Sequence, residues 1–122
     1  SYDMATGEFN DVKLLAGSFG VTGYADGTGT SAKFNEPSQG DVDEDGNFYV
    51  ADRGNHCIRV ITPDGEVSTY AGQNKAGMVD GIASLAEFNN PEGCQFGPDG
   101  ALYVADYSNH AIRKVEDGPA QP

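Results

Sequence analysis

Short apolar runs separated by glycine-rich polar turns are the main pattern along this chain. Residues 48–51 and 101–105 are apolar without interruption, and residues 66–71 mix apolar with polar positions. Short runs rich in Val, Ile, Tyr and Phe and bounded by Asp-Gly are typical of β-strands joined by tight hairpins. The pattern therefore predicts an all-β protein with antiparallel strands and almost no helix.

The same pattern occurs twice. Residues 26–61 align with residues 80–115 at a constant offset of 54, without gaps and with 16 of 36 positions identical. The shared skeleton is Asp-Gly, Phe-Asn-x-Pro, Asp-Gly and then Tyr-Val-Ala-Asp-x-x-Asn-His-x-Ile-Arg. A repeat of this length is one supersecondary unit that buries its faces only by stacking on further copies. We expect strands at 39–43, 47–51, 56–62 and 66–71 in the first unit, and at 93–96, 101–105 and 110–115 in the second.

The second unit lacks a fourth strand, and a matching strand lies near the N-terminus. Val-Lys-Leu-Leu-Ala-Gly at 12–17 parallels Val-Ser-Thr-Tyr-Ala-Gly at 67–72. A closed β-propeller seals its ring in this way, because one end of the chain completes the blade that the other begins. Propellers typically have about four to eight blades, so two blades alone would leave an open strand edge and exposed apolar faces. We therefore expect a homotrimer, in which three chains close a six-bladed ring of four-stranded antiparallel blades by exchanging residues 12–16. Four chains with eight blades, or further blades on a longer polypeptide, are the alternatives.

This organisation sets the expected boundaries. They are an N-terminal extension at 1–10, the donated fourth strand at 11–17, the first blade at 18–72 and the second blade at 73–115. The segment 116–122 reads Glu-Asp-Gly-Pro-Ala-Gln-Pro and has no strand character, so we expect a disordered tail there.

The repeated Tyr-Val-Ala-Asp-x-x-Asn-His-x-Ile-Arg core, with Phe-Asn-x-Pro and Ala-Gly…Asp-Gly before it, resembles the NHL repeat family. The resemblance extends over residues 12–115 and is closest to bacterial NHL proteins that act outside the cytoplasm. It implies a propeller of usually about six blades, with binding sites on the faces or around the central channel, and it favours an extracytoplasmic location. Members of the family include RNA- and protein-binding modules, sensor domains and a few metal-dependent lyases. The chain departs from the family in carrying two repeats.

Net charge narrows the classes of possible partner, and the cysteine content bears on disulfide bonds. The net charge is −12, so nucleic acids and anionic membranes would be repelled. No apolar run is long enough to insert into a membrane. Cys57 and Cys94 have no cysteine counterpart in the other repeat, so we expect free, buried thiols.

Residues present in both repeats are expected to serve the blade itself. Asp and Asn side chains satisfy backbone N–H groups in turns, and Arg pairs with carboxylates. The matched pairs are Asp52/Asp106, Asn55/Asn109, His56/His110 and Arg59/Arg113. Both histidines fall beside the turn between second and third strands, away from a channel, so no metal site is predicted on them.

An acidic stretch at 41–46 resembles the start of an EF-hand calcium loop. The residues that follow it are apolar strand, no helices flank it, and the second repeat has lost two of its carboxylates. We expect Asp43, Glu44 and Asp45 to form a solvated hairpin that binds calcium weakly if at all, and we predict no other cofactor.

Unmatched polar residues are the better candidates for a site. The first strand of each blade lines the channel of a propeller, so Gln39, Asp41 and Gln95 could face an axial pocket. Arg53 and Tyr107 would lie on one rim, and Ser38 stands opposite Glu92 in the repeat.

Two functions are compatible with this sequence. The first is a non-catalytic scaffold or interaction module that assembles with itself and binds a protein or carbohydrate, each surface residue being repeated around the ring. The alternative is part of a six-bladed hydrolase or lyase with a metal-assisted channel site. Catalysis would need His or carboxylates converging on first strands, where the chain offers Asp41 and Asp43. No catalytic residue is therefore predicted, and the scaffold is preferred.

Overall fold

The computed structural model describes residues 2–3, 8–9 and 12–116, and it confirms an all-β protein with antiparallel sheets. Helix is limited to four 3-10 turns in these residues: η1 (Gly29–Ser31), η2 (Arg53–Asn55), η3 (Ala83–Leu85) and η4 (Tyr107–Asn109). None of the described helices is long and apolar enough to cross a membrane. Near the N-terminus, β1 (Tyr2–Asp3) pairs with β2 (Glu8–Phe9). Most of the expected extension and tail lies outside the described residues.

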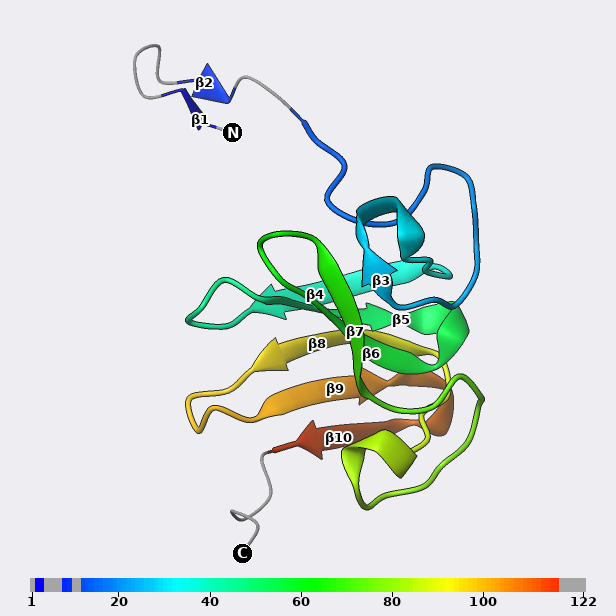
Figure 1. The fold of residues 1–122 in the computed structure, drawn as a ribbon. Helices are drawn as coiled ribbons and strands as arrows, with labels where there is room; N and C mark the ends of the chain where they lie inside the picture. Colours follow the sequence, from blue (N-terminus) through cyan, green and yellow to red (C-terminus); the bar gives the residue numbers. More distant parts are fainter. Residues whose placement is uncertain (1, 4–7, 10–11, 117–122) are drawn as a thin grey trace, which may run out of the picture.

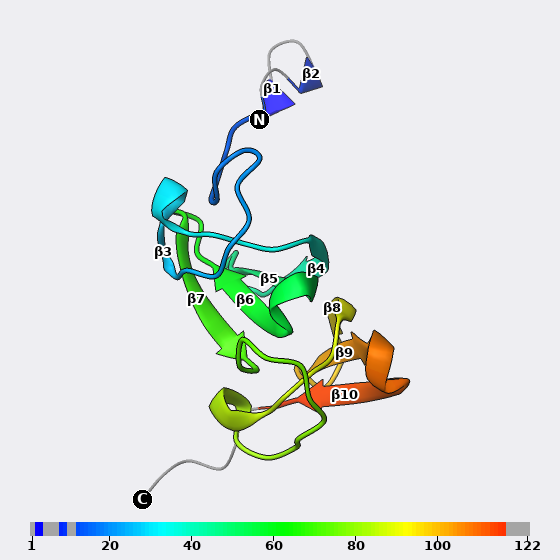
Figure 2. The same ribbon diagram turned by 90° about the vertical axis from the view of Figure 1, so that its right-hand side faces the viewer.

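Each repeat forms one antiparallel sheet. The first contains β4 (Pro37–Val42), β5 (Phe48–Asp52), β6 (Cys57–Ile61) and β7 (Glu66–Ala71), joined at its outer edge by β3 (Gly27–Thr28). The second contains β8 (Pro91–Phe96), β9 (Leu102–Asp106) and β10 (Ala111–Val115). Among the described residues, β10 pairs with β9 alone, so its other edge carries no strand. These sheets are two adjacent blades, seen from two directions in Figures 1 and 2.

The core lies between the blades. Strand β8 packs against β4 and β5, and the apolar side chains of the two sheets interlock there. Ala51, Ile58 and Ala71 of the first blade meet Phe88 and other buried side chains of the second. A second, smaller cluster lies on the opposite side of the first blade and includes Ala32, Val50, Ile61 and Val67.

Several of the predicted strand boundaries were wrong by one or two residues, and the difference at His56 is the most informative. His56 was expected to begin a strand, but it ends η2 in the left-handed conformation with φ of 57°, and the strand starts at Cys57. His110 does the same after η4, with φ of 53°. Left-handed backbone is uncommon for residues other than glycine, although His is among the more tolerant, and here it reverses the chain between two paired strands.

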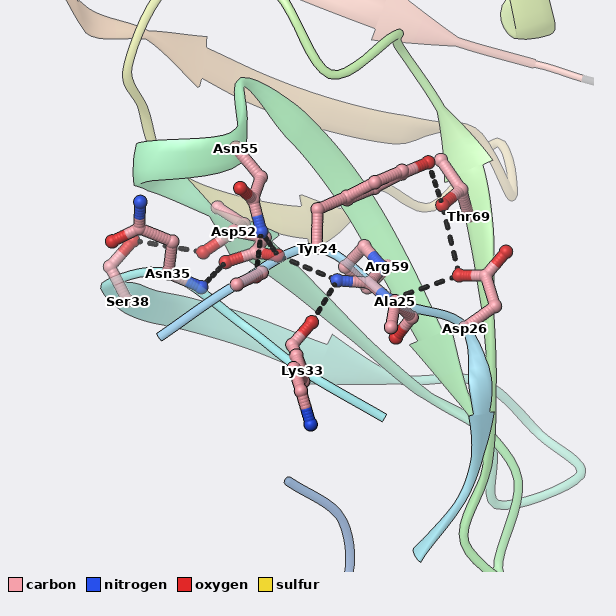
Figure 3. Close-up of polar contacts among 12 residues, drawn as sticks. Tyr24, Ala25, Asp26, Lys33, Asn35, Ser38, Asp52, Asn55, Arg59 and Thr69 are labelled. Atoms are coloured by element: carbon pink, nitrogen blue, oxygen red, sulfur yellow. Dashed lines mark hydrogen bonds and ion pairs between the residues drawn. The ribbon is translucent and has the colours of Figure 1, made fainter. Parts of the chain in front are cut away.

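Arg59 ties the long loop of the first blade to its sheet (Figure 3). Its guanidinium is fully buried and forms an ion pair of 2.8 Å with the buried Asp52. It also donates to the carbonyls of Lys33 and Ala25 at 2.8 and 2.7 Å. It lies 4.9 Å from the ring of Phe34, a distance at which cation–π attraction operates.

Both carboxylate oxygens of Asp52 accept hydrogen bonds. One of its carboxylate oxygens accepts the backbone N–H of Asn35 at 2.8 Å, and the other accepts the Asn55 side-chain amide and Arg59. Asn55 in turn donates to the carbonyl of Gly23. The second blade repeats these bonds through Asp106, Asn109, Arg113 and Asn89.

We expect Arg59→Ala to lower the free energy of unfolding by about 3–5 kcal/mol, because it leaves the Asp52 carboxylate buried without its counter-charge. Arg113→Ala is the matched control and should cost less, since the Arg113 side chain is 11% exposed and its second partner, Asp80, is 92% exposed. Urea unfolding monitored by circular dichroism gives both values. Equal losses in the two variants would contradict this account.

Candidate binding surface at the blade junction

Polar side chains gather where the two inner strands, β4 and β8, lie side by side. Ser38 on β4 donates its hydroxyl to the carbonyl of Glu92 on β8 at 2.6 Å. Arg53, in η2, forms an ion pair with the Glu92 carboxylate at 3.3 Å. The structure thus brings Ser38, Arg53 and Glu92 together, because the start of β4 pairs with the end of β5, the strand that precedes η2.

Two further inner-strand residues serve the contact between the blades. Asp41 accepts the N–H of Phe96, in the next blade, at 3.0 Å, and also accepts the N–H of Val42. Gln39 lies across Gly93: a Cβ at Gly93 would stand 3.1 Å from the Gln39 Cβ. Gly93 therefore leaves room for the Gln39 side chain. Gln95, the counterpart of Asp41, is exposed.

His56 also links the blades. Its Nδ1 accepts the backbone N–H of Asn90 at 3.0 Å, and Asn90 is itself left-handed, with φ of 53°. His110 occupies the same position in the second blade and is exposed. The repeat pattern did not predict this contact, because it joins non-equivalent positions in different repeats.

The remaining candidates lie on an open surface. Tyr107 in η4 is 58% exposed and corresponds to Arg53. A cavity of about 330 Å³ opens beside β8 and β9, and its lining includes Gln39, Glu92, Gln95, Tyr103 and Ile112. This side of the second blade corresponds to the side of the first blade that the second blade covers.

The acidic hairpin is organised by Asp43 rather than freely solvated as expected. One Asp43 oxygen accepts the backbone N–H groups of Asp45 and Asn47, and the other accepts the Asn47 amide and the Tyr49 hydroxyl. These bonds, those of Asn47 above all, lower the Asp43 pKa. Glu44 and Asp45 are exposed. Within the described part of the chain, no group of three or more His, Cys, Asp or Glu residues is placed to hold a metal ion.

Both cysteines are free and buried, as the sequence predicted. Burial raises the pKa of each thiol to about 12. The Cys94 thiol contacts the Tyr49 carbonyl across the blade junction at 3.4 Å. Because the thiolate is the reactive form, this raised pKa disfavours reaction of either thiol at neutral pH.

The two blades bury the same side chains to very different extents. Ile58 is 0% exposed beneath the second blade, whereas its counterpart Ile112 is 73% exposed. Likewise Ala51 is buried and Ala105 is exposed. The face that packs against a neighbour in the first blade is therefore uncovered in the second.

Residues 12–17 contact the first blade in the same way as the end of β7 contacts the second blade. In both places a glycine at the end of the segment donates to the loop of the blade that follows. Gly17 has φ of 94° and donates its N–H to the carbonyl of Gly29 at 3.0 Å. Gly72, at the end of β7, has φ of 95° and donates to Ala83, which is the counterpart of Gly29, at 2.9 Å. Residues 12–16 pair with neither sheet, and Val12 and Leu14 are 101% and 44% exposed.

Antiparallel sheets that pack face to face, with their inner strands β4 and β8 side by side, define adjacent blades of a β-propeller. The sequence model of the NHL repeat matches residues 34–61 and 88–115, which is the core of each blade. The chain belongs to the NHL-repeat family.

Relatives and solved structures agree with this assignment. The chain is 33% identical over 105 residues to NHL repeat-containing protein 2 of Bos taurus, covering 85% of the chain and 14% of the relative. It matches a crystal structure of an auxiliary nutrient binding protein from Bacteroides thetaiotaomicron with a TM-score of 0.85 and 33% identity, over 93% of this chain and 30% of that one. A second protein of that bacterium, named as a candidate phosphatase, gives a TM-score of 0.87 at 31% identity, over 98% and 30% of the two chains.

We expect calcium to leave the thermal midpoint of the protein unchanged, because the Asp43 oxygens are already occupied by hydrogen bonds. Asp43→Ala should lower the midpoint equally with and without calcium, whereas Glu44→Ala, at an exposed position, should have little effect.

The stability of the hairpin should also depend on pH. The folded-state pKa of Asp43 is depressed, so the stabilisation by this carboxylate is complete above about pH 4 and is lost as the pH falls through that lowered pKa. Differential scanning fluorimetry across pH measures this. A calcium-dependent rise in midpoint that disappears in Asp43→Ala would show that the hairpin binds the ion.

Proposed function

We propose that the chain supplies two blades of a closed NHL propeller, built as a six-bladed ring of three copies, and that this ring is a non-catalytic binding module. The observation that supports it best is the exposure of Ile112 and Ala105, whose counterparts Ile58 and Ala51 are covered by a neighbouring blade. A blade packed on that face would bury apolar surface, each Å² contributing about 25 cal/mol. Closed cyclic symmetry supplies such a blade at every junction.

The exchanged strand has a defined register. In the first blade, β7 pairs with β6 so that Ala71 stands opposite Ile58 and Val67 opposite Ile61. Transferred to the second blade, this register places Ala16 opposite Ile112 and Val12 opposite Val115. Strand 12–16 would then complete the hydrogen bonds of the free β10 edge in a neighbouring copy, which removes an edge that otherwise favours aggregation.

We expect the Val12→Cys/Val115→Cys double variant to form disulfides between copies on mild oxidation, up to a covalently closed trimer. The native thiols do not compete, because burial raises their pKa to about 12. Denaturing gels and native mass spectrometry of the 12.8 kDa chain detect the products.

The control pair is Thr22→Cys/Val115→Cys, since Thr22 is exposed but lies outside the exchanged strand. Cross-linking in the test pair alone supports the exchange. A chain that remains monomeric in native mass spectra and forms no cross-link would overturn the ring of three copies and would assign the missing blades to a longer polypeptide.

The assembled ring would repeat each junction residue three times around one axis. Gln39 and Asp41 would then surround the channel with Gln95, while Arg53 and Tyr107 would lie on the rim. Repetition converts a weak single contact into useful avidity. The net charge of −12 favours neutral or basic ligands. One structural neighbour is described as an auxiliary nutrient binding protein, which supports a binding role. Among neutral ligands we propose a carbohydrate.

The hydrolase or lyase alternative has less support from the geometry. Asp41, the inner-strand carboxylate it would use, accepts backbone N–H groups of Val42 and Phe96 and so holds two blades together. His56 likewise accepts a backbone N–H at the junction. The phosphatase name of one neighbour belongs to a chain of which this one spans 30%.

We expect a soluble glycan that binds the wild-type ring to lose affinity for Tyr107→Ala and Gln39→Ala, because an exposed aromatic face and an amide are the groups suited to a neutral polar ligand. Affinity electrophoresis in gels containing neutral polysaccharides provides the screen, and calorimetry gives the affinity. Lys75→Ala is the control, since Lys75 is exposed and far along the chain from the inner strands. Unaltered affinity in both test variants would show that the ligand binds elsewhere than at this surface.

A further inference from the structure

The fourth strand of the first blade, β7, is covered on its outer side by the long loop that precedes β4 in the same blade. Strand β3 pairs with β7, with Gly27 opposite Val67. Just before β3, the Tyr24 hydroxyl is 2.8 Å from the Thr69 hydroxyl, and Thr69 donates to Asp26 at 3.1 Å. A polar pair, Tyr24 and Thr69, therefore fastens this loop to the strand.

The corresponding positions in the second blade are apolar on both sides. Met78 stands where the first repeat has Tyr24, and Leu14 of the 12–17 segment stands where β7 has Thr69. Both are exposed, Met78 by 72% and Leu14 by 44%, and Ile82 in the same loop by 69%. Both members of the pair are thus polar in the first blade and apolar in the second, although Leu14 and Met78 are 64 residues apart in the chain. A joint change of this kind is expected of side chains that touch.

We infer that residues 78–82 form the outer wall of a slot along the free edge of β10, and that strand 12–16 of a second copy of this chain fills it, with Leu14 against Met78. The inference rests on the proposed ring and names the residues that select the exchanged strand. In the slot, Leu14 and Met78 would bury each other's apolar surface. In the first blade, the equivalent residues Tyr24 and Thr69 instead join their hydroxyls by a hydrogen bond.

The occupant is a second copy because the chain's own strand lies elsewhere. Residues 12–16 line a cavity of about 330 Å³ together with Phe34, Phe48 and Val50, on the side of the first blade that faces away from the second. Strand β10 lies at the opposite end of the two-blade stack (Figure 2). Gly17 fixes the end of the segment to the first blade through its bond to Gly29. In the proposed ring, the free edge of β10 is reached by the 12–16 strand of a neighbouring copy.

The difference between the two pairs also gives selectivity. A strand carrying Leu14 beside Tyr24 would leave the Tyr24 and Asp26 groups without the Thr69 hydroxyl that they now contact. Thr69 beside Met78 would place a hydroxyl against a thioether and methylene groups. Each slot thus disfavours the strand of the other, which is how specificity is built against a competing arrangement.

A double-mutant cycle on assembly tests the inference. Leu14→Thr and Met78→Tyr each leave one polar group against one apolar group, so each should raise the dissociation constant of the trimer about tenfold. The double variant recreates the Tyr24–Thr69 pair of the first blade and should recover at least about fivefold of that loss, a coupling in the range found for side chains in contact. Analytical ultracentrifugation over a concentration series measures the constants.

The matched control pairs Leu14→Thr with Leu85→Ser, which copies Ser31 of the first repeat at a position not opposite Leu14. Its two effects should combine additively. Circular dichroism of every variant checks that the blades remain folded. Wild-type chain that does not trimerise would overturn the ring itself; a wild-type trimer in which the Leu14/Met78 effects are simply additive would overturn the Leu14–Met78 contact and leave the ring standing.

Discussion

The buried ion pair between Arg59 and Asp52 is the interaction on which the rest of the blade depends. A guanidinium with no exposed surface is tolerated because its two terminal nitrogens donate to the carboxylates of Asp52 and Asp26 and to two nearby carbonyls. Those carbonyls belong to the loop before the blade, so satisfying the charge also fixes the loop. The loop then carries the strand that borders β7 and the aromatic ring of Phe34.

This arrangement makes each blade well defined internally and dependent on its neighbours externally. All the bonds of the Asp–Asn–Arg network lie within one repeat. The apolar face of the sheet that carries Ile58, in contrast, is buried only by a neighbouring blade. Where a second blade is present, Ile58 is fully buried; where none is, Ile112 is 73% exposed. The free-energy gain of the fold therefore grows with each further blade, as expected of repeat proteins whose units contact mainly their nearest neighbours.

The residues at the blade junction show how a surface built from repeats can still be specific. The matched Asp, Asn and Arg residues make the same bonds in both repeats, whereas unmatched residues make each junction different. Arg53 pairs with Glu92, but its counterpart Tyr107 is exposed. In a ring of two-blade chains, two kinds of junction would alternate. Side chains that differ between repeats can then determine which blades become neighbours and which ligand is bound, while the blade scaffold is unchanged.

The sequence by itself determined the strand pattern, the repeat and the residues of the internal network. These are short-range features: Asp52, Asn55 and Arg59 are separated by three and four residues, and Asp-Gly turns set the hairpins. Such spacing is readable because hairpin geometry relates positions that are close along the chain.

Only the tertiary structure decided the contacts between blades. Ser38 reaches Glu92 across 54 residues, Asp41 reaches Phe96 across 55, and His56 reaches Asn90 across 34. It also placed Asp43 at the centre of its hairpin, and it set the left-handed backbone of His56 that gives the blade junction an acceptor. These outcomes depend on how two sheets dock, and the docking of faces is fixed by packing and backbone hydrogen bonds across the interface, for which residue spacing along the chain carries no signal.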